Sequence, residues 1–306
     1  MGEIWQKLGG DPCPACLGLT TPTSITVEGD GATRRLERCT GCGSQSWSTQ
    51  ARGAATSTYW EDYKAFDLYG EPLVQAAYHA RYERAHAAMT SALGRAPQRI
   101  LDFGGGIGNY ADWLEQRGVA TLTVDADQGA VEAARARGLR ACVTDELEAT
   151  ADPAGYDVIT LWDVIEHIED PAILLASVLA HVAPGGLVFL ETPDAGFPLR
   201  WAVRAGHSVT NGRLDLTSPL YYWEHKVYFT RDGLRTLLAR VGFGEVWGER
   251  WTSPRAKMVN IFDREGGGDN KPGFYRMLAK AYPLASQAVE LTGGGNKQVV
   301  IARRAT

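Results

Sequence analysis

The stretch Asp102–Gly108, DFGGGIG, follows a short apolar run and leads directly into a helical pattern. Its glycines allow the chain to turn sharply and let a ligand come close to the backbone. The dinucleotide-binding spacing G-x-G-x-x-G would require a third glycine at position 109, where this chain has Asn109. The glycines instead occupy alternate positions, Gly104, Gly106 and Gly108, so the loop is a ligand site that departs from the dinucleotide pattern.

A second acidic residue supports a nucleoside ligand. Asp125 ends the apolar run Thr121–Asp125, which is the next strand that the sequence predicts. In folds built from βαβ units, an acidic side chain at the end of the second strand hydrogen-bonds the hydroxyls of a ribose. The glycine loop and Asp125 together therefore predict a ligand that contains a ribose.

Short apolar runs alternate with helical patterns between residues 99 and 190. Strands are expected at 99–103, 121–125, 139–143, 157–161 and 187–190, and helices are expected at about 72–93 and from Asn109, Gln128 and Pro171. This alternation predicts an α/β fold with a doubly wound parallel sheet. Further along, Thr230 caps another helix and Gly242 closes it. Strands at 245–247 and 298–302 are then expected as a hairpin pair at the edge of the sheet.

Four of the five cysteines form two pairs, Cys13 with Cys16 and Cys39 with Cys42, with two residues between the members of each pair. This spacing lets both thiolates of a turn face one metal ion, which predicts a small amino-terminal zinc ribbon. Two disulfides are the alternative, but they need an oxidising compartment, for which the sequence shows no targeting signal. Four sulfur ligands leave no open position, so the expected Zn²⁺ is structural.

The remaining cysteine and the residues between the two pairs have structural interpretations. Ser24–Val27 and Arg35–Arg38 are expected to pair as strands that bring the two cysteine turns together. Cys142 lies alone in an apolar run, which is typical of a small buried hydrophobic residue, and we assign it no chemistry.

Charge and hydropathy exclude two classes of partner. The formal net charge is −5, the isoelectric point is about 5.7, and the Lys and Arg residues are scattered, which argues against a nucleic-acid groove. The longest apolar stretch, Ala172–Ala183, is shorter than the roughly 20 residues that span a bilayer. We therefore expect a cytoplasmic protein with no nucleic-acid partner and no transmembrane segment.

The chain is expected to divide into three parts. They are a zinc ribbon at 1–50, a linker and helical cap at 51–95, and a main domain at 96–306 with insertions at about 193–223 and 252–296. Aromatic residues in these insertions indicate an apolar or ring-bearing acceptor, or else ordinary packing of a lid. The helix expected at 272–291 is apolar around most of its circumference, which fits a lid, a homodimer interface or a membrane contact.

The motifs resemble those of the class I methyltransferases that use S-adenosylmethionine (SAM), over about residues 70–306. The motifs that carry the resemblance are Ile100–Gly108, Val124–Asp125, Asp157–His167, Pro184–Pro193 and His225–Thr230. The resemblance implies a seven-stranded Rossmann-like sheet with SAM as the methyl donor. One departure is Phe103–Gly105, where the family often has valine followed by Gly-Cys-Gly, and we expect no loss of function from it.

The resemblance also assigns the cofactor-binding residues. Asp102, Gly104 and Gly106 would hold the methionine part of SAM, whose ammonium needs an acceptor, and Asp125 would hold the ribose. Asp145 would lie at the adenine, and Trp162 and Asp163 would border the sulfonium. Gly105, Gly108 and Ala126 complete the expected set.

A general base is needed if the acceptor is a hydroxyl or an activated carbon, and histidine is suited to that role. The ribbon together with Tyr222, Glu224, His225 and Tyr228 resembles the sugar-nucleotide C-methyltransferases of deoxysugar pathways. In that family these residues line the sugar site, so the resemblance implies His225 as the catalytic base with Tyr222 and Glu224 beside it. Those enzymes continue into a large carboxyl-terminal domain that this sequence does not contain. We expect methyl transfer to a small-molecule acceptor in secondary-metabolite or glycan-precursor biosynthesis.

Two alternatives stay open at this point. Asp163, Glu166 and His167 would face the same way from one helical turn and could chelate Mg²⁺. Quinone-pathway O-methyltransferases resemble this stretch and use their matching residues for such a metal, although the same pattern also occurs in family members without one. The second alternative is a binding protein in which the ribbon recruits a macromolecular partner and SAM is only a ligand.

Overall fold

The computed structural model describes residues 12–29, 32–48, 72–209, 220–222, 224–254 and 294–305, and seven of the strands in these ranges form one sheet. Its strands are β4 (Arg99–Phe103), β5 (Ala120–Asp125), β6 (Ala141–Val143), β7 (Tyr156–Trp162), β8 (Val182–Pro193), β10 (Phe243–Trp251) and β11 (Lys297–Arg304). The order across the sheet is β10-β11-β8-β7-β4-β5-β6. Strands β4 to β8 run parallel, whereas β11 pairs antiparallel with both β8 and β10. The predicted seven-stranded sheet with an antiparallel edge pair is confirmed.

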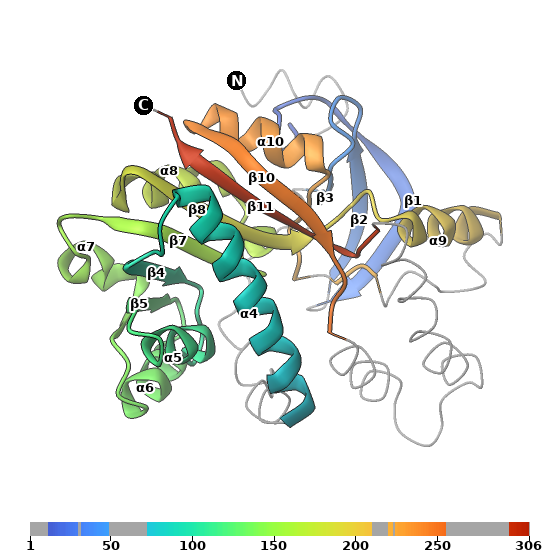
Figure 1. The fold of residues 1–306 in the computed structure, drawn as a ribbon. Helices are drawn as coiled ribbons and strands as arrows, with labels where there is room; N and C mark the ends of the chain where they lie inside the picture. The colour runs from blue at the N-terminus through green and yellow to red at the C-terminus, as the bar shows by residue number, and fades with distance from the viewer. Residues whose placement is uncertain are drawn as a thin grey trace.

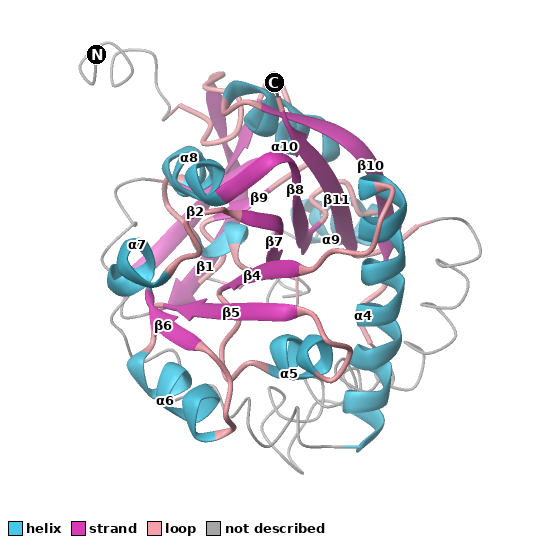
Figure 2. Cartoon of the chain, turned by 60° about the vertical axis from the view of Figure 1, so that its left-hand side comes forward, coloured by secondary structure: helices cyan, strands magenta, loops and turns pink. Residues whose placement is uncertain are grey.

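Helices cover both faces of this sheet (Figures 1 and 2). The helices are α4 (Pro72–Leu93), α5 (Asn109–Glu115), α6 (Gln128–Ala136), α7 (Leu147–Thr150), α8 (Pro171–His181), α9 (Pro198–Val209) and α10 (Arg231–Arg240). Two 3₁₀ turns, η2 (Thr144–Glu146) and η3 (Ile165–His167), follow strands β6 and β7. Among the described helices, none combines the length and apolar character that crossing a bilayer requires.

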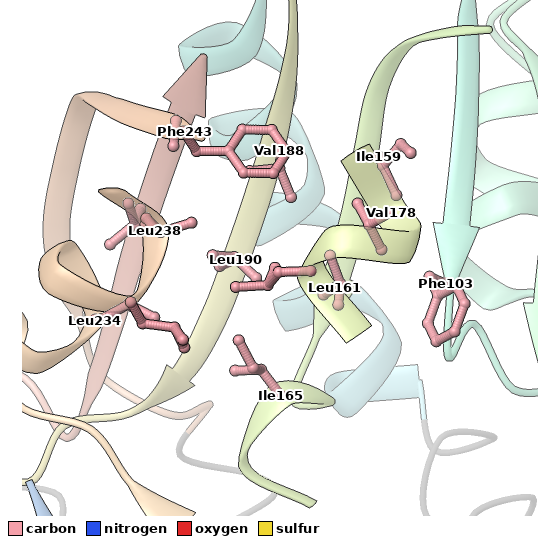
Figure 3. Close-up of a cluster of buried hydrophobic side chains, with 14 of the residues drawn as sticks. Phe103, Ile159, Leu161, Ile165, Val178, Val188, Leu190, Leu234, Leu238 and Phe243 are labelled. Atoms are coloured by element: carbon pink, nitrogen blue, oxygen red, sulfur yellow. The ribbon is translucent and has the colours of Figure 1, made fainter. Parts of the chain in front are cut away.

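Alternation along the strands divides the core into two layers, because successive side chains of a strand point to opposite faces. Leu101 of β4 packs in the layer beneath α8 and α10, and its neighbour Ile100 packs in the layer beneath α4 and α5. Figure 3 shows the first layer, where Leu234 and Leu238 of α10 lie against Leu190 of β8. Burial on both faces explains why these strands read as nearly continuous apolar runs.

Local capping explains where several helices begin and end. The Asp127 side chain accepts a hydrogen bond from the Ala130 N–H at the start of α6, and Asp170 caps α8 in the same way. Thr230 accepts from the Gly233 N–H and caps α10, as the sequence predicts. Gly242, with a φ of +89°, closes α10 in the left-handed conformation that favours glycine.

A second, four-stranded sheet holds the amino-terminal cysteines. Strands β1 (Thr20–Gly29), β2 (Ala32–Cys39) and β3 (Gln45–Trp47) pair antiparallel in sequence order. Thr26 lies opposite Arg35, which confirms the predicted pairing between the two cysteine turns. The fourth strand, β9 (Val227–Tyr228), comes from the main domain, between α9 and α10, and pairs antiparallel with β3. Sequence reasoning did not anticipate this junction.

Several sequence predictions concern residues outside the described ranges. They include residues 51–71 of the linker and cap, residues 210–219 and 223 of the first insertion, most of the second insertion and the helix expected at 272–291. The lid, homodimer and membrane-contact interpretations of that helix therefore stay predictions.

The contact between α10 and the cysteine-bearing sheet generates a stability prediction. A Cβ added at Gly233 would lie 2.0 Å from the Ser44 Oγ and 3.2 Å from the Cys42 Sγ. We expect Gly233→Ala to lower the free energy of unfolding by about 1–3 kcal/mol through overpacking, measured by thermal or urea denaturation. Gly244→Ala is the matched control, since a Cβ there meets no atom within 4 Å. Equal stability of the two variants would contradict this docking.

Candidate active site

The glycine loop turns sharply after β4 and bonds to the neighbouring strand β5. Gly104, Gly106 and Gly108 have φ values of +71°, +55° and +78°, in the left-handed region that favours glycine. The N–H groups of Gly104 and Gly105 both donate to the Val124 carbonyl, at 2.7 and 3.2 Å. A Cβ on Gly105 would lie 2.5 Å from the Asp102 Oδ2. The predicted sharp turn is present, and no side chain larger than hydrogen fits at its centre.

Asp125 ties this loop to the neighbouring strand. Its Oδ2 accepts from the Gly106 N–H at 2.8 Å, and its Oδ1 accepts from the Asp127 N–H at 3.0 Å. Each oxygen retains a second lone pair, which is the acceptor that a ribose hydroxyl needs. The Asp125 carboxylate therefore lies at the loop and can accept the hydrogen bond that the predicted ribose contact requires.

Asp102 is a buried carboxyl group beneath the loop. Its Oδ1 accepts from the Thr160 hydroxyl at 2.8 Å, and burial raises the pKa of Asp102 to about 7. Two neighbouring hydroxyls, those of Tyr110 and Thr123, are buried and have no hydrogen-bond partner among the described residues. Burial, with the nearby Asp102 charge, also raises the pKa of Tyr110. Unsatisfied polar groups around an acidic side chain fit a ligand that carries an ammonium and further polar atoms.

The other predicted cofactor residues also lie at the carboxyl edge of the sheet. Ala126 and Asp145 follow β5 and β6 and are both exposed. Trp162 ends β7 with its ring centroid 4.5 Å from that of Phe189, and its indole N–H is buried without a partner among the described residues. Their contacts with the cofactor stay predictions.

The acidic segment after β7 corrects one expectation. Asp163, Glu166 and His167 do not share one helical turn, because Asp163 has a φ of +53° and only Ile165–His167 form a 3₁₀ turn. Asp163 thus lies outside the group that Glu166, His167 and His225 form, in which one ligand atom per residue lies within 4.8 Å of the others. A left-handed backbone at a non-glycine residue marks a strained, constrained position.

His225 lies beside this turn. Its ring centroid is 4.7 Å from that of His167, and Glu166 is fully buried with its Oε2 accepting from the Thr192 hydroxyl at 2.9 Å. The residue before this 3₁₀ turn, Val164, contacts the glycine loop. A Cβ on Gly104 would lie 2.4 Å from a methyl carbon of Val164. The predicted base and the predicted donor loop therefore meet at one edge of the sheet.

Tyr222 lies beside His225, and the site roles expected for Tyr222 and Glu224 stay predictions. The Tyr222 and His225 ring centroids are 5.4 Å apart. The Tyr228 hydroxyl accepts from the Tyr222 N–H at 2.7 Å and donates to the Tyr222 carbonyl at 3.0 Å, which fixes the segment that holds His225. Glu224 is half-buried, and burial raises its pKa.

Lys297 belongs to the site, and sequence reasoning missed it. Its ammonium forms an ion pair with Asp163, and its Nζ lies 3.9 Å from the Glu166 Oε1. The side chain is only 10% exposed. A lysine at the start of the apolar run Gln298–Ala302 was the available signal, because a buried lysine is rarely found without a carboxylate partner.

Burial sets the protonation states of the titratable groups. It raises the pKa of Glu166 to about 8 and lowers the pKa of His167 to about 4. Burial, followed by the charges of His167 and Lys297, also lowers the pKa of His225 well below its usual value. Both imidazoles are therefore neutral near pH 7, and a neutral imidazole nitrogen can accept a proton.

The four amino-terminal cysteines form a compact group. Their Sγ atoms all lie within 4.8 Å of one another, with 3.7 Å between Cys13 and Cys42 and 3.4 Å between Cys16 and Cys39. All four thiols are free, so no disulfide joins them, and Cys142 is a separate buried thiol. Four converging sulfurs are the donor set of a structural Zn²⁺ site.

The cysteine-bearing sheet forms one wall of the His225 segment. Gln45 of β3 lies opposite Tyr228 of β9, and the Tyr221 hydroxyl donates to the Gln45 Oε1 at 3.1 Å. The Thr230 hydroxyl donates to the Cys42 carbonyl at 2.6 Å. The residues on both sides of His225 are therefore held by the part of the chain that carries the cysteines.

A cavity of about 800 Å³ lies elsewhere, beside the outer strand β10. Arginines of α4, β10 and α10 line it, and they form ion pairs with Glu191, Glu249, Glu245 and Asp194. Its lining includes neither the glycine loop nor His225. The candidate site therefore rests on the geometry of its residues and not on this cavity.

Comparison with known proteins supports a methyltransferase fold. A family model described as a methyltransferase domain matches residues 74–246. The ubiquinone biosynthesis O-methyltransferase of Leptothrix cholodnii is 33% identical over 102 residues, which are 31% of this chain and 43% of that protein. The protein of the same name from Aeromonas salmonicida is 34% identical with the same coverage. The chain thus spans less than half the length of these relatives.

Two solved structures share the fold at low sequence identity. Magnesium protoporphyrin IX methyltransferase from Synechocystis, with bound S-adenosylhomocysteine (SAH), has a TM-score of 0.51 and 14% identity, covering 81% of this chain and 97% of that one. A SAM-dependent methyltransferase from Archaeoglobus fulgidus has a TM-score of 0.50 and 14% identity, covering 79% and 100%. Both likenesses therefore cover about four fifths of this chain.

Asp102 generates a pH prediction for SAM binding. If the Asp102 carboxylate accepts the SAM ammonium, as the sequence predicts, protons compete with SAM once the pH falls below the Asp102 pKa of about 7. We expect the Kd for SAM to rise by up to about tenfold per pH unit below that value, measured by calorimetry from about pH 8 to about pH 5.5. Asp102→Asn should bind SAM weakly with little pH dependence. A flat wild-type profile would contradict this role of Asp102.

Proposed function

We propose that this chain, which belongs to the methyltransferase-domain family and is a SAM-dependent methyltransferase, methylates a small-molecule acceptor with His225 as the general base. When bound, SAM supplies a methyl group activated by a sulfonium. The glycine loop, Asp102 and Asp125 orient the donor at the carboxyl ends of β4 and β5. The observation that carries the proposal is the placement of His225 beside the turn that touches Gly104.

The residues on the acceptor side have two roles in the proposed reaction: one accepts a proton, and the others orient it. An acceptor oxygen or carbon that attacks the methyl carbon must lose a proton, and a neutral His225 nitrogen is placed to take it. The His225 Nδ1 is buried without a hydrogen-bond partner among the described residues, so it has an unused position. Tyr222 and Tyr228 flank the imidazole, with both ring centroids 5.4 Å away, and restrict its orientation. Such a positioned base contributes about 10²–10⁴-fold to a rate.

The four cysteines are proposed to bind one structural Zn²⁺ that holds this segment in place. Their sulfurs fill a tetrahedral sphere and leave no position for a substrate. Because β3 pairs with β9, the order of the cysteine-bearing sheet is transmitted to the residues that follow His225. The metal would thus support the acceptor side of the site without taking part in methyl transfer.

The proposal is tested by incubating the protein with methyl-labelled SAM and a metabolite extract. We expect label in a small-molecule fraction, and we expect His225→Ala to lower kcat by about 10²–10⁴-fold while the Kd for SAM stays unchanged. His79→Ala, which alters an exposed histidine of α4, is the matched control and should keep full turnover. Full turnover in the His225 variant would refute the base assignment.

A second candidate function is O-methylation of a phenolic acceptor of the quinone type. The similarity to ubiquinone biosynthesis O-methyltransferases over about a third of the chain favours it. Carbon-13 labelling of the transferred methyl group tests this second candidate, because O-methyl and C-methyl carbons have different chemical shifts. An O-methylated phenol as product would favour this second candidate, and a C-methylated sugar would exclude it.

The zinc proposal leads to its own prediction. We expect one Zn²⁺ per chain by elemental analysis, and we expect Cys39→Ser to lose the metal, melt at a lower temperature and lose methyl transfer. The control is Cys142→Ala, which alters the buried thiol outside the group and should keep the Zn²⁺. A stable, active Cys39→Ser protein without zinc would show that the metal does not organise the site.

A further inference from the structure

Lys297 brings a positive charge to the acidic turn from a distant part of the chain. It is the first residue of β11, where it lies opposite Pro193 of β8 and Trp251 of β10 in the sheet. From there its ammonium forms an ion pair with Asp163 and lies 3.9 Å from the Glu166 Oε1. Backbone pairing on both sides of β11 therefore fixes where this charge enters the site.

The two acidic side chains that face this ammonium differ in charge. The Glu166 side chain is 0% exposed, and its Oε1 has no hydrogen-bond partner among the described residues. An unpaired charge there would be strongly unfavourable, and burial raises the pKa of Glu166 to about 8, so the negative charge at this place comes mainly from Asp163. The sequence pattern of Asp163–His167 predicts that the same two acidic side chains and His167 bind a divalent metal ion. Either such a metal ion or the Lys297 ammonium can provide the positive charge at this place.

The donor set with Lys297 present does not fit Mg²⁺. Magnesium requires nearly octahedral oxygen ligands at about 2.0–2.1 Å and usually keeps several waters. Lys297 takes one carboxylate of the pattern, Asp163, and the ammonium would repel a divalent ion placed between Asp163 and Glu166. The three groups that do converge, Glu166, His167 and His225, include the proposed base.

We propose that Lys297 is the built-in cation of the acceptor site and occupies the place that a divalent metal would otherwise take. Methyl transfer by this chain then needs no divalent cation. The part concerning turnover rests on the proposed function, whereas the part concerning metal exclusion does not. Lys297 acts as a positioning residue, because it holds Asp163 in its left-handed conformation and compensates the charge next to Glu166.

The direct test is a titration of the full-length, zinc-loaded protein with Mn²⁺, followed by electron paramagnetic resonance. We expect the wild-type protein to bind no Mn²⁺ at submillimolar concentrations. Lys297→Ala should bind one Mn²⁺, because the Asp163 and Glu166 side chains that flank the ammonium then face the vacated position. Lys297→Arg, which keeps the positive charge, should bind none, and Asp163→Asn combined with Lys297→Ala should abolish the binding.

Two outcomes would overturn the proposal. The first is a wild-type protein that binds one Mn²⁺ at a site that Asp163→Asn removes, a measurement that needs no change at Lys297. The second is a folded Lys297→Ala variant that binds no Mn²⁺, because the vacated position would then not be a cation site. Binding of SAH by calorimetry shows whether each variant is folded.

Turnover provides an independent readout. Labelled methyl transfer by the wild-type protein should not change on addition of Mg²⁺ or Mn²⁺, whereas Lys297→Ala should lose about tenfold or more and regain activity with Mn²⁺. A wild-type rate that depends on an added divalent ion would contradict the proposal. If no variant transfers label to any acceptor, the proposed function fails, while the Mn²⁺ titration still decides the role of Lys297.

Discussion

The backbone pairing of β3 with β9 joins the cysteine-bearing sheet to the segment that holds His225. Gln45 lies opposite Tyr228, and Ser46 lies opposite Val227. The seven-stranded sheet forms the glycine loop by itself, but the acceptor side of the site takes residues from both sheets. The position of His225 therefore depends on residues near the other end of the chain, and the cysteine-bearing sheet is an integral wall of the site.

Buried charge is distributed unevenly between the two sides of this site. The donor side holds Asp102 and Asp125, whose oxygens accept from a hydroxyl and from backbone N–H groups, so it suits a cationic ligand. On the acceptor side the ammonium of Lys297 pairs with Asp163, and burial keeps His225 neutral. In the proposed function, this division would separate donor binding from proton removal.

Local signals in the sequence were sufficient for the fold, whereas long-range contacts were not. The glycine loop, the Thr230 cap and the cysteine pairs each have a local physical cause, and the structure confirms the turns, the helix start and the cysteine grouping. The β9 strand has only two residues, too short for a periodic pattern, so its pairing with β3 was missed. Lys297 reaches Asp163 only through the strand order of the sheet, and the left-handed φ of Asp163 has no signature in an ordinary acidic segment.

The proposed function requires the donor loop and the base to face one space, which a crystal structure of the zinc-loaded protein with SAH would show. We expect the SAH amino group at Asp102, the ribose hydroxyls on Asp125 and the sulfur facing the space in front of His225. SAH bound away from the glycine loop, or a sulfur separated from His225 by the protein backbone, would contradict it.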